Sequence, residues 1–161
     1  MGSDLKPAPV PVIAEVVTPQ ADGRIVLRAA EANIHGSSPL YEKDGAKDQN
    51  GYWGDARDFV FWNLQVGHRG VFAVSITYSC IPGAEGSEFL VEVNAQKLIG
   101  TSKVTRSWAE YTTESLGQVR FDQPGTLALS VKPKIDKAPW KVIGLKSVIL
   151  TPVGNGEKGS P

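Results

Sequence analysis

Short runs in which apolar and polar residues alternate recur along most of the chain, and they predict β-strands. Strand side chains point to opposite faces in turn, so alternation indicates one buried and one solvated face. The clearest runs cover residues 25–32, 59–66, 71–78, 87–94, 97–100, 117–121, 126–131 and 142–150. No long segment has helical periodicity. About nine short strands at this spacing predict an all-β antiparallel sandwich, with a jelly roll as the leading topology.

The stretch from residue 51 to 66 joins a polar loop with two large aromatic residues to one of these strands. Trp62 and the residues two positions away would share one face, and Phe59 and Phe61 would share the other. Bulky residues on both faces predict a strand that is covered on both sides, as in the middle of a sandwich. We predict that Trp62 lies in the core.

Composition shifts divide the chain into three parts. Four prolines fall between residues 5 and 20, and proline favours extended chain without ladder hydrogen bonds. We therefore predict a linker or an arm lying on the domain at residues 1–22, which suggests a domain cut from a larger protein. The sandwich is expected over residues 23–152, and a disordered tail over residues 153–161.

Two connections stand out. Residues 33–51 are too polar for the core and too long for a simple turn, and we predict a functional loop there. Residues 67–70, Gly-His-Arg-Gly, are predicted to form a hairpin turn.

The charge balance excludes some classes of partner. The chain has 17 Lys+Arg and 17 Asp+Glu residues, so its formal net charge is zero. Nucleic-acid binding needs a basic excess, so no nucleic-acid partner is expected. No apolar run is long enough to span a membrane. Cys80 is the only cysteine, which excludes an intrachain disulfide and a cysteine-based zinc site.

No motif indicates catalysis. The chain has no Gly-x-Ser-x-Gly elbow, phosphate loop, dinucleotide fingerprint or zinc-ligand spacing. Its two histidines, His35 and His68, lie in predicted turns and are interpreted as solvated loop residues. A glycosidase pair could hide among the scattered carboxylates, since such pairs meet in space rather than in sequence. Ordinary surface charge explains them better, and we expect no enzyme.

The tryptophans carry more information. Trp53, Trp108 and Trp140 each lie in or beside a predicted loop. Sugar rings have apolar C–H faces that stack on aromatic rings, while a few polar groups bind the hydroxyls. These three residues are therefore candidate ligand-binding residues. The alternative is that they plug the ends of the sandwich.

Several short motifs follow one another in a recognisable order. They are Ala30-Glu31-Ala32, Gly51-Tyr52-Trp53, Asp58-Phe59-Val60-Phe61-Trp62, Gly70-Val71-Phe72-Ala73-Val74, Ser107-Trp108-Ala109-Glu110-Tyr111, Gly125-Thr126-Leu127-Ala128-Leu129 and Gly144-Leu145-Lys146-Ser147-Val148-Ile149-Leu150. This order resembles the family 6 and family 35 carbohydrate-binding modules, of the galactose-binding-like β-sandwich class. It is similar also to accessory domains of secreted bacterial sulfatases and glycosidases.

The resemblance implies a sugar site in the loops at one end of the sandwich. An aromatic residue of the Gly-Tyr segment, here Tyr52 or Trp53, and Trp108 would hold a sugar between them. An asparagine of the family, just before the last strand, is replaced here by Gly144. Trp140 lies nearby and would compensate by stacking.

The resemblance also implies a structural calcium ion, bound in part by a glutamate in the first strand and an aspartate in the last. Glu31 matches the first position and is the one candidate metal ligand. Lys146 stands at the second position, where Ca²⁺ needs an oxygen ligand. We therefore expect no cofactor.

The leading hypothesis is a non-catalytic carbohydrate-binding module that targets an appended glycan-active enzyme to a polysaccharide or oligosaccharide. The alternative is a structural or protein-interaction domain of a sulfatase or glycosidase, without a ligand of its own. A stand-alone hydrolase has only scattered carboxylates to support it. The first residues, Met1–Asp4, resemble a cloning remnant from which a leader has been removed, so a secreted or periplasmic location is expected.

Overall fold

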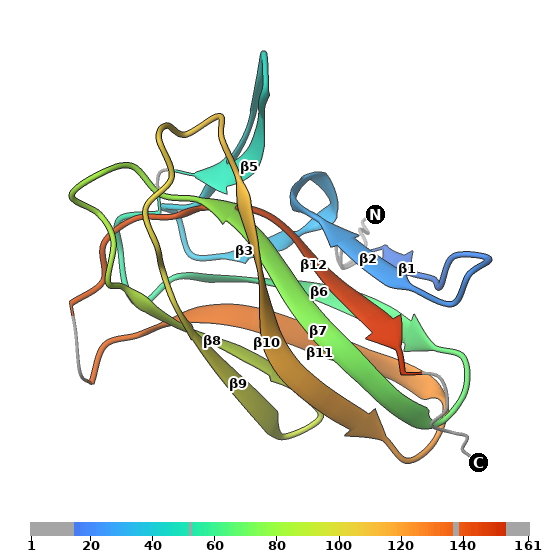
Figure 1. Cartoon of the computed structure of the whole chain (residues 1–161). Helices are drawn as coiled ribbons and strands as arrows, with labels where there is room; N and C mark the ends of the chain where they lie inside the picture. Colours follow the sequence, from blue (N-terminus) through green and yellow to red (C-terminus); the bar gives the residue numbers. More distant parts are fainter. Residues whose placement is uncertain (1–14, 52, 137–138, 154–161) are drawn as a thin grey trace, which may run out of the picture.

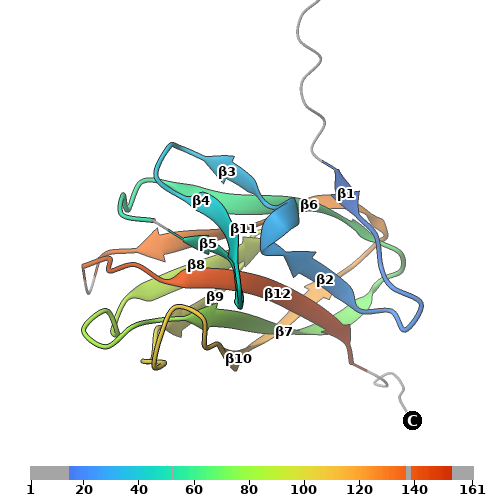
Figure 2. The same ribbon diagram turned by 90° about the horizontal axis from the view of Figure 1, so that it is seen from above.

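The computed structural model describes residues 15–51, 53–136 and 139–153 and shows two β-sheets packed face to face (Figures 1 and 2). Sheet A contains β1 (Val16–Val17), β3 (Asn33–His35), β6 (Phe59–Val66), β8 (Glu88–Val93), β9 (Gln96–Thr101) and β11 (Gly125–Lys134). Sheet B contains β2 (Ile25–Arg28), β4 (Leu40–Asp44), β5 (Lys47–Gly51), β7 (Gly70–Ser79), β10 (Thr112–Phe121) and β12 (Gly144–Pro152). The predicted all-β sandwich is confirmed.

Both sheets are built mainly from antiparallel pairs. Sheet A has the order β1-β6-β11-β8-β9, and β3 shares the edge of β6 with β1. Sheet B has the order β10-β7-β12-β5-β4, and β2 pairs with β12. The exception is β1, which runs parallel to β6. This short strand lies within the predicted arm, so the described part of the arm joins a sheet edge.

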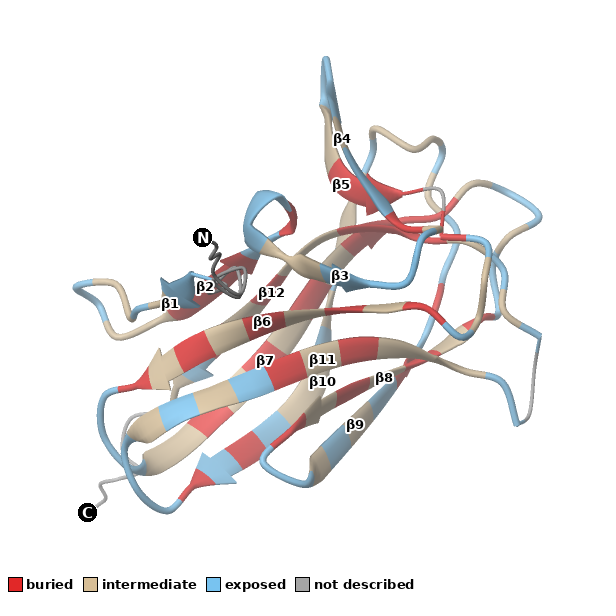
Figure 3. Cartoon of the chain, turned by 180° about the vertical axis from the view of Figure 1, so that it is seen from behind, coloured by how far each residue is buried: buried red, intermediate tan, exposed pale blue. Residues whose placement is uncertain are grey.

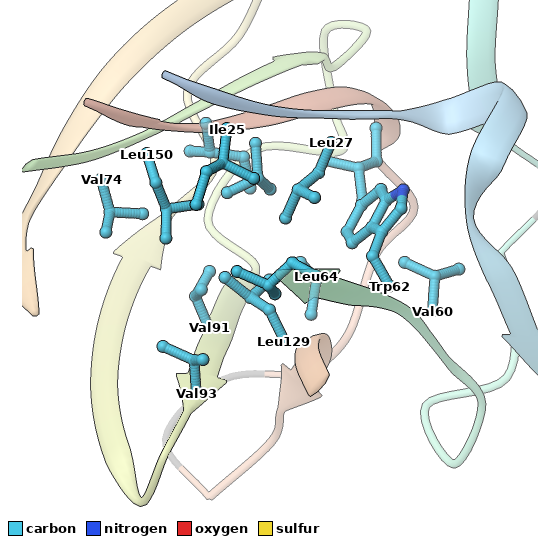
Figure 4. Packing of buried hydrophobic residues seen from close by; sticks show 14 of the residues in the cluster. Ile25, Leu27, Val60, Trp62, Leu64, Val74, Val91, Val93, Leu129 and Leu150 are labelled. Carbon is cyan, nitrogen blue, oxygen red and sulfur yellow. The ribbon is translucent and has the colours of Figure 1, made fainter. Parts of the chain in front are cut away.

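The core lies between the sheets, and alternation along the strands produces it. On β6 the residues Val60, Trp62, Leu64 and Val66 are fully buried, and the same banding is visible along β8 and β11 (Figure 3). Side chains from both sheets meet in this layer (Figure 4). The Trp62 indole N–H also donates to the carbonyl oxygen of Arg28 at 2.8 Å. The prediction that Trp62 is a core residue is confirmed.

The outer face of β6 differs from the prediction. Phe59 and Phe61 are only half-buried, because no described segment forms a third layer over sheet A. His35 stacks on Phe59 with ring centroids 4.4 Å apart, and the Lys132 ammonium lies 4.8 Å from the centre of the same ring. The prediction that both faces of this strand are covered was therefore wrong. Edge strand β3 and long polar side chains shield the outer face in part.

Three local predictions are corrected by the pairing of the strands. Residues 33–51 are not one loop but β3 followed by the β4–β5 hairpin. The hairpin projects from the body of the sandwich (Figure 1), and its strands lack the apolar alternation that marks a core strand. The strand predicted over residues 25–32 ends at Arg28, as β2, and is followed by a 3₁₀-helix, Ala29–Glu31. Residues 67–69 connect sheet A to sheet B, so they do not form a hairpin turn.

The described residues contain no helix that is long and apolar enough to cross a membrane. Cys80 is buried among them.

Candidate functional site

A pocket of about 230 Å³ opens at the end of the sandwich that carries the β4–β5 hairpin. Three segments that are far apart in sequence meet there: the hairpin, the connection from β9 to β10, and the segment before β12. The lining residues are Glu42, Lys47, Gln49, Gly51, Trp108 and Val142. One aromatic and one aliphatic side chain therefore face a carboxylate, an amide and an ammonium group.

Strand β5 places its side chains in the pocket by alternation. Lys47, Gln49 and Gly51 are two residues apart and line the same wall. A Cβ atom at Gly51 would overlap the carboxylate of Glu42, so a side chain at this position would displace that carboxylate. The Glu42 carboxylate occupies this space and lies 3.4 Å from the Lys47 ammonium.

Gln49 is the centre of the polar wall. Its side chain is buried, and its Oε1 accepts hydrogen bonds from the Ser79 and Tyr111 hydroxyls, each at 2.9 Å. Its Nε2 donates to Oε1 of Glu42 at 2.7 Å. The amide orientation is thereby determined, since only its oxygen can accept and only its nitrogen can donate. The Glu42 carboxylate is consequently held in one position.

Gly144 has a steric role in the same wall. A Cβ atom at this position would overlap both the Gln49 amide and the Ser79 hydroxyl. No side chain fits there while Gln49 keeps its place. The Gln49 amide, which comes from strand β5, supplies a hydrogen-bonding group beside the pocket at this point.

Tyr111 supports the wall from behind. Its hydroxyl accepts from the Asp48 backbone N–H at 3.0 Å while donating to Gln49. Burial is the main cause that raises the pKa of Tyr111 above its usual value. The Lys146 ammonium lies 4.7 Å from the centre of the Tyr111 ring, a cation–π contact. Lys146 therefore faces this ring.

The four aromatic residues predicted for the site do not share one location in the structure. Trp108 is half-buried and lines the pocket. Trp53 is fully buried, and its indole N–H donates to the Asp58 carbonyl oxygen at 2.9 Å. Trp140 packs on Trp53 with ring centroids 5.2 Å apart and donates to the Trp53 carbonyl oxygen at 2.7 Å. Tyr52 lies outside the described residues.

Trp53 and Trp140 form an aromatic pair beneath the loops, and neither belongs to the lining of this pocket. Of the predicted residues with described positions, only Trp108 is brought to it. Sequence reasoning missed Glu42, Lys47 and Gln49, because they were assigned to a long polar loop. The signal that could have found them is the alternation of positions 47, 49 and 51, with a glycine at the last.

Glu31, the predicted metal ligand, is exposed on the 3₁₀-helix. Among the residues with described positions, no group of three or more His, Cys, Asp or Glu side chains could hold a metal ion. Calcium takes six to eight oxygen ligands in proteins. Glu31 and a lysine turned towards Tyr111 do not supply such a set, so the residues present do not fit the ion.

A second, wider hollow of about 680 Å³ lies beside the β9–β10 connection. Its lining includes Pro82, Val104, Arg106, Glu110 and Tyr111. Tyr111 contributes to this hollow and, through Gln49, to the wall of the pocket. The two depressions therefore share a supporting residue.

No family model matches the sequence, and no curated protein matches it. Solved structures do. A family 35 carbohydrate-binding module from Clostridium thermocellum superposes with a TM-score of 0.66 at 13% identity, over 81% of this chain and 98% of that module. This chain therefore has the same β-sandwich fold as that module.

The same fold occurs within longer proteins. The chain matches the GH26-CBM35 β-(1,4)-mannanase of Podospora anserina with a TM-score of 0.64 at 17% identity, over 87% of this chain and 29% of the mannanase. It also matches the mosquito-larvicidal Cry4Aa toxin of Bacillus thuringiensis with a TM-score of 0.64 at 13% identity, over 86% of this chain and 25% of the toxin. At these identities the likeness establishes the shared β-sandwich fold and nothing finer.

Proposed function

We propose that this chain is a non-catalytic carbohydrate-binding module and that the pocket at Trp108 holds a sugar. The observation that carries the proposal is the lining, which combines an indole ring with a carboxylate, an amide and an ammonium group. The C–H face of a sugar ring would stack on the indole of Trp108. The hydroxyls of the sugar would form hydrogen bonds with Glu42, Gln49 and Lys47. These three side chains differ from one another in their capacity to donate and to accept.

The size of the pocket limits what it can hold. Sites for drug-sized ligands have volumes of roughly 300–1,000 Å³, and this pocket has about 230 Å³. It therefore suits one sugar unit. The wider hollow at Tyr111 offers room for neighbouring units of a longer chain.

The polar wall supports binding rather than catalysis. Glycoside hydrolysis uses a pair of carboxyl groups on either side of the scissile bond. Glu42 is the one carboxylate among the described residues that line the pocket. Its two oxygens are engaged by Gln49 and Lys47. A hydrolase would need a second carboxyl group on the other side of the sugar.

We further propose that the module is attached to a glycan-active enzyme, which it directs to a polysaccharide, and that the protein is secreted or periplasmic. The match to part of a mannanase supports an appended catalytic domain. We propose neither a nucleic-acid nor a membrane partner, because the net charge is zero.

One observation favours the alternative, a protein-interaction domain without a sugar ligand. The β4–β5 hairpin projects from the sandwich (Figure 1) and exposes Leu40 by 53% and Tyr41 by 40%. These two residues point to opposite faces of the hairpin, so a partner protein that grips the hairpin would cover apolar surface on both sides. In that case the hairpin, rather than the pocket, would be the functional element.

Isothermal titration calorimetry with a panel of neutral and acidic oligosaccharides distinguishes a carbohydrate-binding module from a protein-interaction domain. We expect binding in the millimolar to micromolar range, roughly −4 to −8 kcal/mol. Trp108→Ala should abolish it and Trp108→Phe should retain part of it. Ile135→Ala, at a residue exposed by 58%, is the control for loss of an exposed apolar side chain. Binding by Trp108→Ala as tight as by the unmodified chain would contradict the proposed site. Failure of every glycan to bind the unmodified chain would leave the interaction domain.

A further inference from the structure

A hollow of about 620 Å³ lies at the opposite end of the sandwich, where β6 connects to β7 (Figure 1). Its lining includes His68, Arg69, Gln118 and Arg120. No acidic side chain belongs to its described lining. The hollow therefore gathers hydrogen-bond donors and positive charge.

Strand β10 determines the direction of Arg120. Val119 and Phe121 on either side are buried, so alternation turns Arg120 to the outer face of sheet B. The Gln96 side chain holds the backbone here. Its Nε2 donates to the Arg120 carbonyl oxygen at 2.6 Å, and its Oε1 accepts from the Arg120 N–H at 2.8 Å. The base of the Arg120 side chain is thus anchored.

The β6–β7 connection positions Arg69. His68 stacks on Phe72 with ring centroids 6.0 Å apart, and its Nδ1 donates to the Arg69 carbonyl oxygen at 2.9 Å. These contacts fasten an otherwise exposed turn to the core. Arg69 is exposed beside them.

These two arginines differ from most others in the chain because they lack acidic partners. Three of the six arginines form ion pairs: Arg24 with Asp22, Arg57 with Asp55, and Arg106 with Glu110. Arg69 and Arg120 form none with any residue in the described ranges. Asp122, the nearest acidic residue in sequence to Arg120, lines a separate hollow beyond the end of β10. In a chain of zero net charge, this is a local concentration of positive charge.

We propose that this hollow is an anion-binding site, in which Arg69 and Arg120 bind the sulfate ester or carboxylate groups of an acidic polysaccharide. A guanidinium group presents a planar set of donors that matches two oxygens of such a group. Gln118 adds an amide donor at the rim. The polysaccharide as carrier of the anions rests on the proposed function, whereas the anion chemistry rests on these residues alone.

Affinity electrophoresis in gels that contain dextran sulfate, polygalacturonate or neutral dextran tests the site. We expect retardation by at least one polyanion and none by neutral dextran. The two polyanions distinguish sulfate esters from carboxylates. Retardation should disappear in about 1 M NaCl, where the Debye length is about 3 Å.

The double variant Arg69→Gln/Arg120→Gln should weaken polyanion binding about tenfold or more, equivalent to about 1.4 kcal/mol. The double variant Arg28→Gln/Lys43→Gln removes the same charge from two exposed residues outside the hollow and should change binding less than about twofold, since such long-range effects are screened. Both should keep the melting temperature of the unmodified chain.

Trp108→Ala should bind the polyanion as before, which separates this site from the proposed sugar pocket. The inference is overturned if neither polyanion is bound, if neutral dextran retards the chain equally, or if the two double variants lose binding to the same extent.

Discussion

Trp53 and Trp108 occupy similar places in the sequence and different places in the molecule. Each lies in a polar connection beside a small residue, Gly54 or Ser107. Trp53 is fully buried, donates to Asp58 and supports Trp140. Trp108 is half-buried and lines a pocket with polar groups opposite. Whether a loop tryptophan packs in the core or lines a binding pocket therefore depends on the residues that surround its ring in the folded chain. Its immediate neighbours in sequence do not reveal these surroundings.

The largest effect is expected at the buried member of this pair. Trp53→Ala should lower the free energy of unfolding by about 3–5 kcal/mol, the usual consequence of emptying a buried aromatic site. Urea titration followed by circular dichroism measures it, and Trp62→Ala is the matched control for a core tryptophan on a strand. A loss below about 1 kcal/mol, as at surface sites, would show that Trp53 is not part of the core.

The second-largest loss of stability is expected at Gln49, in the polar wall of the pocket that Trp108 lines. Gln49→Leu should cost about 1–3 kcal/mol, because the Ser79 and Tyr111 hydroxyls would each lose a buried acceptor. It should also weaken glycan binding, since Glu42 would lose the amide that orients it. Thr113→Ala, which removes an exposed hydroxyl–hydroxyl bond to Thr77, is the control in the same urea titration. Equal stability of the two variants would contradict the network.

A smaller change in stability is expected at the half-buried tryptophan. Trp108→Ala should lower the free energy of unfolding by about 1 kcal/mol, because the ring already meets solvent and leaves no closed cavity. Differential scanning calorimetry of this variant beside Trp53→Ala tests the comparison directly. Equal losses would mean that both tryptophans are plugs.

The smallest effect is expected on chelation. Addition of EDTA should leave the melting temperature unchanged, since an ion stabilises the folded state only through its binding to it. Glu31 has no cluster of carboxylates around it in the described ranges. A fall in melting temperature that added calcium reverses would show that oxygen ligands of another kind hold the ion.

Local patterns were sufficient for much of the fold. The period of two along β6, β7, β8 and β11 marks strands with one buried face, and it places Trp62 in the core because a strand cannot turn one side chain without turning its neighbours. Charge balance and the single cysteine likewise depend on composition alone. The resemblance drawn from ordered short motifs led to the family 35 fold that the solved structures share.

The binding pocket required the tertiary structure. Gln49 meets Ser79 and Tyr111, which are 30 and 62 residues away in the chain. The β4–β5 hairpin was hidden because its polar strands are held by backbone pairing, which leaves little trace in hydrophobic periodicity. Trp53 and Trp108 were separated only by packing. Alternation and composition are local properties of the sequence, whereas burial and hydrogen-bond partners are decided by contacts between segments that only the folded chain brings together.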